Sequence, residues 1–475
     1  MNIPLLIVVV YIVVLFAIGY YASRLVKRGK EGFFLAGRRL PAPLVAVTLT
    51  GLAVGGATTI GVATKAFAGQ GLAAGWYGVA WAVSAFVVGL VVSRRFRRLD
   101  IVTVPQLFED CYDKAAHVAC VAVQVMVQIV ITSLQYVAGG AILHQLLPEV
   151  FTTRQHGMIF SAIVFIALTI VGGLWSASLG NILNVTLIYG GVTLAAVLSV
   201  QAAGGLDKLA ELLPADQNYL HPVEGFGLAN ILIFTLVMVT CNIGFQATVQ
   251  IAFAARSEKS ARNGFLLGGL LILPVSFLAA LIGVAAKACF PEIEDGTTAL
   301  PKMVGSLDPL VAGITLAALW AADVSTACGL LLSSSTVVVR DVYLRHVRPE
   351  TDHEHQLRLN RCVVLIIGVV TLALALQIGD ILDALMQGLS LMTGLTVVIL
   401  FTFYAPRLCR AGSAFWTILA GIAVMALWQL VPAVRVVPHV IYMEWIVCVA
   451  VFLAVMRFDT RRIRVPVAAS DPLSV

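Results

Sequence analysis

The chain has 475 residues, of which 60% are hydrophobic and only 12% are charged, with a formal net charge of +6. Soluble domains carry about 25% charged residues, so this composition excludes a globular protein that stays in water. The basic residues stand in small clusters between apolar runs, which is typical of loops beside anionic lipid rather than of a nucleic-acid-binding surface.

Long apolar runs follow one another along the whole chain, separated by short polar breaks. A helix needs about 20 mostly apolar residues to cross a bilayer, and the runs lack the period-2 alternation of a transmembrane β-barrel. We therefore expect an all-α membrane protein with about 13 transmembrane helices in a single domain, 1–475. In chain order the expected helices cover residues 3–22, 43–68, 72–93, 115–145, 156–175, 180–202, 228–253, 263–289, 308–338, 360–378, 381–404, 413–431 and 439–457.

The basic residues predict the orientation of these helices. If the N-terminus lies outside, the inner loops and the C-terminal tail together hold 25 of the 31 lysine and arginine residues. Lysine and arginine are concentrated in the cytoplasmic loops of membrane proteins. We therefore expect a multi-pass protein of a bacterial-type inner membrane, with its N-terminus outside and its C-terminus in the cytoplasm.

The expected helix 43–68 is unusual because glycines and hydroxyl residues gather near its middle. The glycines are Gly51, Gly55, Gly56 and Gly61, and each costs about 1 kcal/mol relative to alanine in a helix. Small residues also let neighbouring helices approach closely, which explains such a cluster without any binding site. The alternative is a discontinuous helix whose freed carbonyls bind a cation.

The expected helix 308–338 carries a complementary feature. Its middle contains Asp323, Ser325 and Thr326, and a second hydroxyl run follows at 333–336. Hydroxyl and carbonyl oxygens suit a small hard cation, although a hydroxyl in a helix also bonds back to its own backbone. Together the two helices indicate a small-cation site between them. Since the sequence contains no GxxxxGK[ST] phosphate loop, an ion gradient rather than ATP is the expected energy source.

Four short motifs stand in order along the chain: 32–38 (GFFLAGR), 103–108 (TVPQLF), Gln250 followed by 254–259 (AARSEK), and the hydroxyl-rich stretch 325–343. Together they resemble motifs of the sodium:solute symporter family, which includes the bacterial sodium/proline and sodium/galactose transporters. The resemblance extends over nearly the whole chain, and each motif stands in the matching position relative to the expected helices.

The resemblance implies a sodium-coupled secondary active symporter that imports a small polar organic solute, such as an amino acid or a carboxylate, by alternating access. We expect no enzymatic activity, no cofactor or metal beyond the coupling sodium ion, no nucleic acid and no obligate protein partner. The implied fold is a leucine-transporter-type core of 5+5 helices in two inverted repeats. The implied parts are an extra N-terminal helix at 3–22, a first repeat at 43–202, a second repeat at 228–404 and two extra helices at 413–457.

Matching the family motifs position by position implies five sodium ligands. They are the backbone carbonyls of Gly51, Val54 and Ala322 and the hydroxyls of Ser325 and Thr326. Some relatives have a second sodium site that uses an aspartate of the sixth span and a serine three residues after the threonine. This chain has Asn181 and Gly329 at those positions, so we expect one sodium ion per cycle.

Two charged residues inside expected spans are further candidates for coupling, because an intramembrane charge is costly. The family pattern is usually apolar at the position of Asp323. This residue either adds negative potential near the sodium or takes a proton, or it faces a water-filled vestibule. Lys65 would lie about 16 Å beyond Val54 along a helix. It either snorkels to the outer interface or attracts an anionic solute.

Residues that face the solute are implied less directly. Family position gives Thr58, Trp81, Asn242, Gln246 and Gln387. Polar residues also recur at helical spacing on the expected helix 115–145, namely Gln124, Gln128, Thr132 and Gln135. Each of these residues either faces the solute or joins helices by hydrogen bonds.

Two other functions stay open on the sequence alone. One is a proton-coupled or uncoupled carrier of the same fold, which Asp323 would serve. The other is a membrane solute sensor, although no signalling module is evident in the sequence.

Overall fold

The computed structural model describes residues 3–26, 32–215, 217–347, 352–377, 386 and 388–463, and these are almost entirely helical. Short 3-10 or π-helical segments, including η2 (Ala57–Gly61), η3 (Ala66–Gln70), η4 (Gly71–Gly75) and η6 (Val338–Tyr343), join several of the α-helices. The α-helices are α1 (Ile3–Val26), α2 (Gly32–Leu35), α3 (Ala42–Ala53), α4 (Val62–Lys65), α5 (Trp76–Val91), α6 (Ser93–Arg98), α7 (Val104–Cys111), α8 (Lys114–Leu146), α9 (Arg154–Ala202), α10 (Leu206–Leu212), α11 (Leu228–Gly244), α12 (Gln246–Ala254), α13 (Glu258–Cys289), α14 (Ala299–Gly305), α15 (Pro309–Val337), α16 (Leu344–His346), α17 (His353–Ala375), α19 (Thr393–Tyr404), α20 (Ser413–Leu430) and α21 (Val440–Phe458).

The protein is a multi-pass membrane protein. Among the described residues, nine helices are long and apolar enough to cross a bilayer, and the bent pair of α11 and α12 makes a tenth. Two further apolar helices, Ala42–Ala53 and Gly388–Tyr404, are shorter. The all-α class is therefore confirmed, whereas the count of thirteen spans stays a prediction.

Helix α9 is too long for one crossing. Its 49 residues would measure about 74 Å as one straight helix, more than twice the roughly 30 Å of a hydrocarbon core. The helix is interrupted at Gly173, where φ is 56° and ψ is −149°. This interruption lies near the end of the expected span 156–175 and before the expected span 180–202, so α9 contains both of them.

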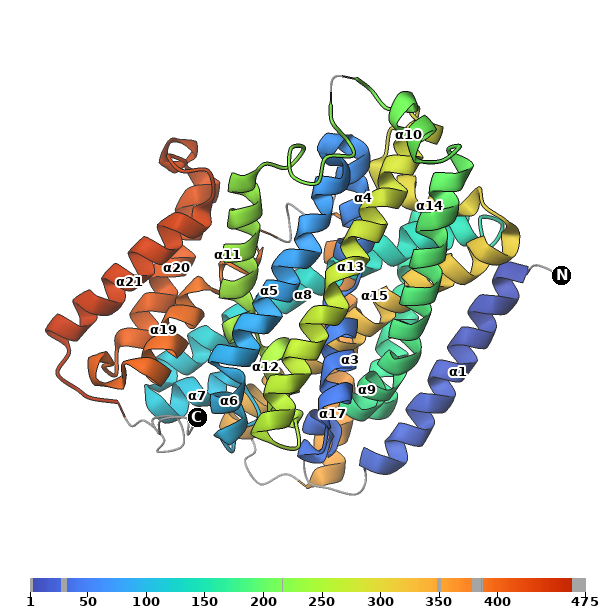
Figure 1. Ribbon diagram of the computed structural model, residues 1–475. Helices are drawn as coiled ribbons and strands as arrows, with labels where there is room; N and C mark the ends of the chain where they lie inside the picture. Colours follow the sequence, from blue (N-terminus) through green and yellow to red (C-terminus); the bar gives the residue numbers. More distant parts are fainter. Residues whose placement is uncertain are drawn as a thin grey trace.

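The helices stand side by side, with α1 at one edge and α20 and α21 at the opposite edge (Figure 1). Helix α15 lies inside this arrangement and packs against α1, α3, α8 and α9. In its most apolar window 89% of the residues are buried, compared with 28% for α1 and for α21. Helix α15 is therefore surrounded by protein, and the edge helices face lipid.

Two of the membrane helices are broken. Helix α3 ends at Ala53, Val54 is extended with φ −94° and ψ 94°, and the helix resumes at Ala57 in η2. Helices α11 and α12 meet at an angle of 53°, with Phe245 extended between them. The structure thus confirms the discontinuous form of the second expected span and adds a second break that the sequence analysis did not predict.

Gly173 is the residue that allows α9 to turn. Its backbone conformation is one that essentially only glycine adopts, and a Cβ at this position would lie 2.5 Å from the carbonyl oxygen of Phe33. We expect Gly173→Ala to destabilise the purified protein by about 1–3 kcal/mol, measured by thermal unfolding in detergent.

The matched control is Gly190→Ala on the same helix. Nothing lies within 4 Å of a Cβ at Gly190, so this change should leave stability unchanged or raise it by up to about 1 kcal/mol. Equal melting temperatures for the two variants would contradict the role given to Gly173.

Candidate functional site

The five residues predicted as sodium ligands lie together where the end of α3 meets α15. The Oγ of Ser325 lies 2.8 Å from the carbonyl oxygen of Gly51 and 2.7 Å from that of Ala322. The Oγ1 of Thr326 lies 3.0 Å from the Gly51 carbonyl oxygen and 3.3 Å from that of Val54. All five residues are buried. The fold therefore brings three carbonyl and two hydroxyl oxygens into one cluster, which we call the five-oxygen cluster.

The break in α3 is the reason that its carbonyls are available. In a continuous helix the carbonyl of Gly51 would accept from the N–H of Gly55, and that of Val54 from the N–H of Thr58. Here the N–H of Gly55 donates to Oγ1 of Thr58 at 2.9 Å, and the N–H of Thr58 donates to the carbonyl of Gly55 at 3.1 Å. The carbonyls of Gly51 and Val54 thus turn to the hydroxyls of α15 instead. They also stand at the C-terminal end of a helix, where the dipole favours a cation.

Asp323 lies beside this cluster and is completely buried. The polar group that faces it is the backbone of Gly56, and a Cβ on Gly56 would lie 3.0 Å from its Oδ1. Within the described part of the chain, neither carboxylate oxygen has a partner with full hydrogen-bond geometry. Asp323 therefore places a carboxyl group, without a paired cation, next to the break in α3.

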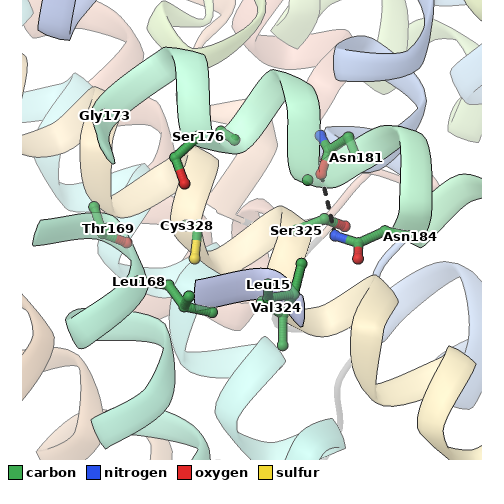
Figure 2. A pocket seen from close by; sticks show the side chains of 12 residues that line it. Leu15, Leu168, Thr169, Gly173, Ser176, Asn181, Asn184, Val324, Ser325 and Cys328 are labelled. Carbon is green, nitrogen blue, oxygen red and sulfur yellow. Dashed lines mark hydrogen bonds between the residues drawn. The ribbon is translucent and has the colours of Figure 1, made fainter. Parts of the chain in front are cut away.

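A chain of amides occupies the other side of Ser325. The Nδ2 of Asn184 donates to Oδ1 of Asn181 at 3.3 Å, and the hydroxyl of Tyr11 donates to Oδ1 of Asn184 at 2.9 Å. Figure 2 shows both asparagines on α9 close to Ser325 on α15, with Leu15 of α1 in front of them. Nδ2 of Asn181 also reaches the carbonyl of Thr48 at 3.5 Å. Neutral amides thus adjoin the five-oxygen cluster on this side.

A small cavity adjoins the five-oxygen cluster. It offers about 20 Å³ for the centres of water-sized molecules, which is room for about one water. Thr326 contributes both to this cavity and to the cluster. The residues that line the cavity are Leu52, Ala53, Gly55, Ala57, Tyr77, Trp81, Ile131, Gln135, Phe245, Thr326, Leu330 and Leu389.

The residues predicted to face the solute are not all at this cavity. Trp81 lines it, and its Nε1 donates to the hydroxyl of Tyr77 at 3.2 Å. Thr58 instead closes the break in α3, and Asn242 accepts from Oγ1 of Thr248 at 2.7 Å across the bend between α11 and α12. Gln246 accepts from the N–H of Val104 at 2.7 Å.

Two predicted positions remain, Gln387 and Lys65. Gln387 lies outside the described residues. Lys65 forms the last turn of α4, is partly buried and does not line the cavity.

Several cavity residues were not among the predicted solute contacts. Tyr77 precedes Trp81 by one helical turn on α5, so helical periodicity from Trp81 would have found it. Gln135 belongs to the polar stripe of the expected helix 115–145, which pointed toward it without assigning a role. Phe245 and Leu389 carry no sequence signal, because apolar residues in an apolar chain do not stand out.

Comparisons with known proteins place the chain in a family. The model of the family described as "Sodium:solute symporter family" matches residues 33–421. The sodium/pantothenate symporter of Escherichia coli strain K12 is 26% identical over 77% of this chain and 78% of its own length. The sodium/proline symporter of Staphylococcus aureus strain RF122 is 24% identical over 89% of this chain and 85% of its own.

A solved structure gives the same fold. A Na⁺-coupled sialic acid symporter, in a substrate-bound outward-open state, superposes with a TM-score of 0.81 at 17% identity. The superposition covers 98% of this chain and 100% of the other. At this level of identity the likeness concerns the fold alone.

Proposed function

Because this chain belongs to the sodium:solute symporter family, and is thus a sodium-coupled symporter of a small solute, we propose that it binds sodium at the five-oxygen cluster and imports its solute by alternating access. The observation that supports this site most directly is the pair of α3 carbonyls, Gly51 and Val54, that lack their helical partners and face Ser325 and Thr326. Broken membrane helices that expose such carbonyls are a recurring way of binding Na⁺ in transporters.

Sodium at this position would join two helices that belong to different parts of the chain. The ion would draw the end of α3 against α15, and Thr326 would be shared between the ion and the adjoining cavity. A solute in that cavity and an ion in the cluster would then favour the same arrangement of the two helices. Ligands that favour the same state bind cooperatively, and this is the physical basis of the proposed coupling.

We also propose the finer architecture, with thirteen spans and two inverted five-helix repeats at 43–202 and 228–404. It is supported by the two breaks, because α3 begins the first of these segments and α11 begins the second. Interrupted helices at corresponding positions of two halves are typical of such transporters. The basic loops support an outside N-terminus and a cytoplasmic C-terminus in a bacterial-type inner membrane.

The solute is proposed to be a small polar organic molecule. The residues that line the cavity are uncharged, with Tyr77, Trp81, Gln135 and Thr326 as its polar side chains. In this structure the cavity has room for about one water, so it must widen to admit the solute. The printed names of related symporters include glucose, pantothenate and proline as solutes. Lys65 remains a candidate for attracting an anionic solute before it enters.

Replacing Ser325 and Thr326 together by alanine tests the sodium site. The double variant loses two of five ligands, each contributing about 1.5 kcal/mol, so sodium affinity should fall about 100-fold. Binding of radiolabelled sodium to the purified protein measures this loss, and sodium stimulation of uptake should vanish with it.

The matched control is Ser334→Ala with Ser335→Ala on the same helix. Those hydroxyls donate to the carbonyls of Leu330 and Leu332 within α15. Sodium affinity should therefore stay within about twofold of that of wild type. Full sodium binding by the Ser325 and Thr326 double variant would refute the assignment.

A single sodium ion per protein molecule is the expected stoichiometry. Asn181 and Gly329 supply neither the carboxylate nor the hydroxyl of a second site, and Asn181 is bonded to neighbouring protein groups. Equilibrium binding of radiolabelled sodium at saturation should therefore give one ion per chain, whereas two ions would contradict the proposal. Asn181→Asp combined with Gly329→Ser restores both groups and should raise the count.

Asp323 is proposed to add negative potential at the sodium site. A buried charge this close contributes on the order of 1.4 kcal/mol even after screening, so Asp323→Asn should weaken sodium binding about tenfold. Asp308→Asn is the control, because Asp308 caps the far end of the same helix, about 22 Å away. Unchanged sodium affinity in Asp323→Asn would exclude this role.

A further inference from the structure

Helix α8 contacts both broken helices through glutamine side chains. Gln124 and Gln135 stand 11 residues apart on it, which is about three turns and about 16 Å, so they share one face. Gln124 reaches the bend between α11 and α12, and Gln135 reaches the break in α3. Both side chains are fully buried. Gln128 stands between them but donates only to the carbonyl of Gln124 on its own helix, at 3.0 Å.

The contact of Gln124 replaces backbone bonds that the bend removes. Its Nε2 donates to the carbonyl of Gly244 at 2.6 Å, and its Oε1 accepts from the N–H of Gln246 at 3.0 Å. One side-chain amide thus satisfies the acceptor before Phe245 and the donor after it. Without water in the bilayer core, each of these groups would cost several kcal/mol if left unpaired.

Gln135 makes the corresponding contact at the other break. Its Oε1 accepts from the N–H of Gly56 at 2.8 Å, and its Nε2 donates to the carbonyl of Ile131 on α8 at 3.1 Å. The second bond fixes the side chain to its own helix, so the first bond fixes Gly56 relative to α8.

The segment at this break is held from two sides. A Cβ on Gly55 would lie 2.5 Å from Oγ1 of Thr326 and would also collide with Oε1 of Gln135. Gly55 therefore lies between α8 and α15, with Val54 directly before it. Because Val54 contributes a carbonyl to the five-oxygen cluster, any shift of this segment moves that oxygen.

We propose that Gln135 is a positioning residue for the sodium site. Through the N–H of Gly56 it holds the segment 54–56 against α15, so that the carbonyl of Val54 faces Thr326. Gln135 also lines the adjoining cavity, so a solute that contacts it acts on the same segment. The proposal rests on the sodium site described under the proposed function, but it assigns a role to a residue that does not touch the ion.

Gln124 provides an internal comparison. It has the same side chain, lies on the same helix and holds a helix break in the same manner, yet its break contributes no carbonyl to the five-oxygen cluster. A general loosening of α8 would affect both breaks alike. A positioning role predicts that only the loss of Gln135 changes sodium affinity.

The test uses the full-length protein in lipid nanodiscs and the variants Gln135→Met, Gln124→Met, Gln128→Met and Gln135→Glu. Methionine retains the length of the side chain and removes its hydrogen bonds, whereas glutamate retains an oxygen acceptor for Gly56. Radiolabelled sodium measures affinity, and amide hydrogen exchange of peptides from 52–60 and 242–250 reports each break.

We expect Gln135→Met to bind sodium about tenfold more weakly and to exchange faster only in the peptide 52–60. Gln124→Met should exchange faster only in 242–250, with sodium affinity close to that of wild type, and Gln128→Met should change neither. Gln135→Glu keeps the acceptor for Gly56 but loses the donor to Ile131. It should therefore retain more of the protection at 52–60 and more of the sodium affinity than Gln135→Met.

Three results would overturn the inference. They are wild-type affinity in Gln135→Met, equal losses of affinity in the Gln124 and Gln135 methionine variants, and a loss in Gln135→Glu that matches that of methionine. In each of these cases wild-type protein binds sodium and the proposed function stands. If wild-type protein binds no sodium, the proposed sodium site itself fails, and the inference fails with it.

Discussion

Inside a bilayer no water is available to satisfy a backbone N–H or carbonyl, so every group that a broken helix exposes must find a partner within the protein. The two breaks in this chain show how that constraint is met. At the bend between α11 and α12, one amide of Gln124 pairs with a carbonyl and an N–H. At the break in α3, Thr58 and Gln135 take the N–H groups of Gly55 and Gly56. The carbonyls of Gly51 and Val54 remain, and they meet the hydroxyls of α15. The two α3 carbonyls of the candidate site are thus groups that the protein's own helical bonding does not use.

The sequence was sufficient for the parts of the fold that depend on composition and on local glycine content. Apolar run length predicted an all-α membrane protein, and the glycines at 51–61 indicated a break in α3 as one of two alternatives, the other being close helix packing. The bend at Phe245 was not predictable in the same way. It contains no glycine cluster, and its stability comes from Gln124, which is more than a hundred residues away in sequence. Similarly, the joining of two spans in α9 includes an interruption at Gly173, where the carbonyl oxygen of Phe33 leaves no room for a Cβ.

The candidate site could likewise be predicted only in part from the sequence. The five predicted sodium ligands are brought together because they form two groups that each span about one helical turn, and because α3 and α15 pack in contact. The groups are Gly51 with Val54, and Ala322 with Ser325 and Thr326. The predicted solute residues had no such restriction. Thr58, Asn242 and Gln246 have hydrogen-bonding side chains at helix interruptions, where satisfying the backbone competes with binding a ligand. In this structure each of the three side chains forms a hydrogen bond with the backbone. Their assignment as solute contacts therefore stays a prediction.

The hydroxyls of Ser325 and Thr326 each carry one proton that a neighbouring carbonyl can accept. For Ser325 the acceptor is the carbonyl of Gly51 or Ala322, and for Thr326 it is that of Gly51 or Val54. A sodium ion at the cluster would bind the lone pairs of both hydroxyl oxygens and of the carbonyl oxygens. Both hydroxyl protons would then have to rotate toward other acceptors. When the ion leaves, the protons can return and hold α3 against α15 without it. The contact between the helices can thus persist in an empty carrier, and the return half of a transport cycle need not begin with the two helices already separated.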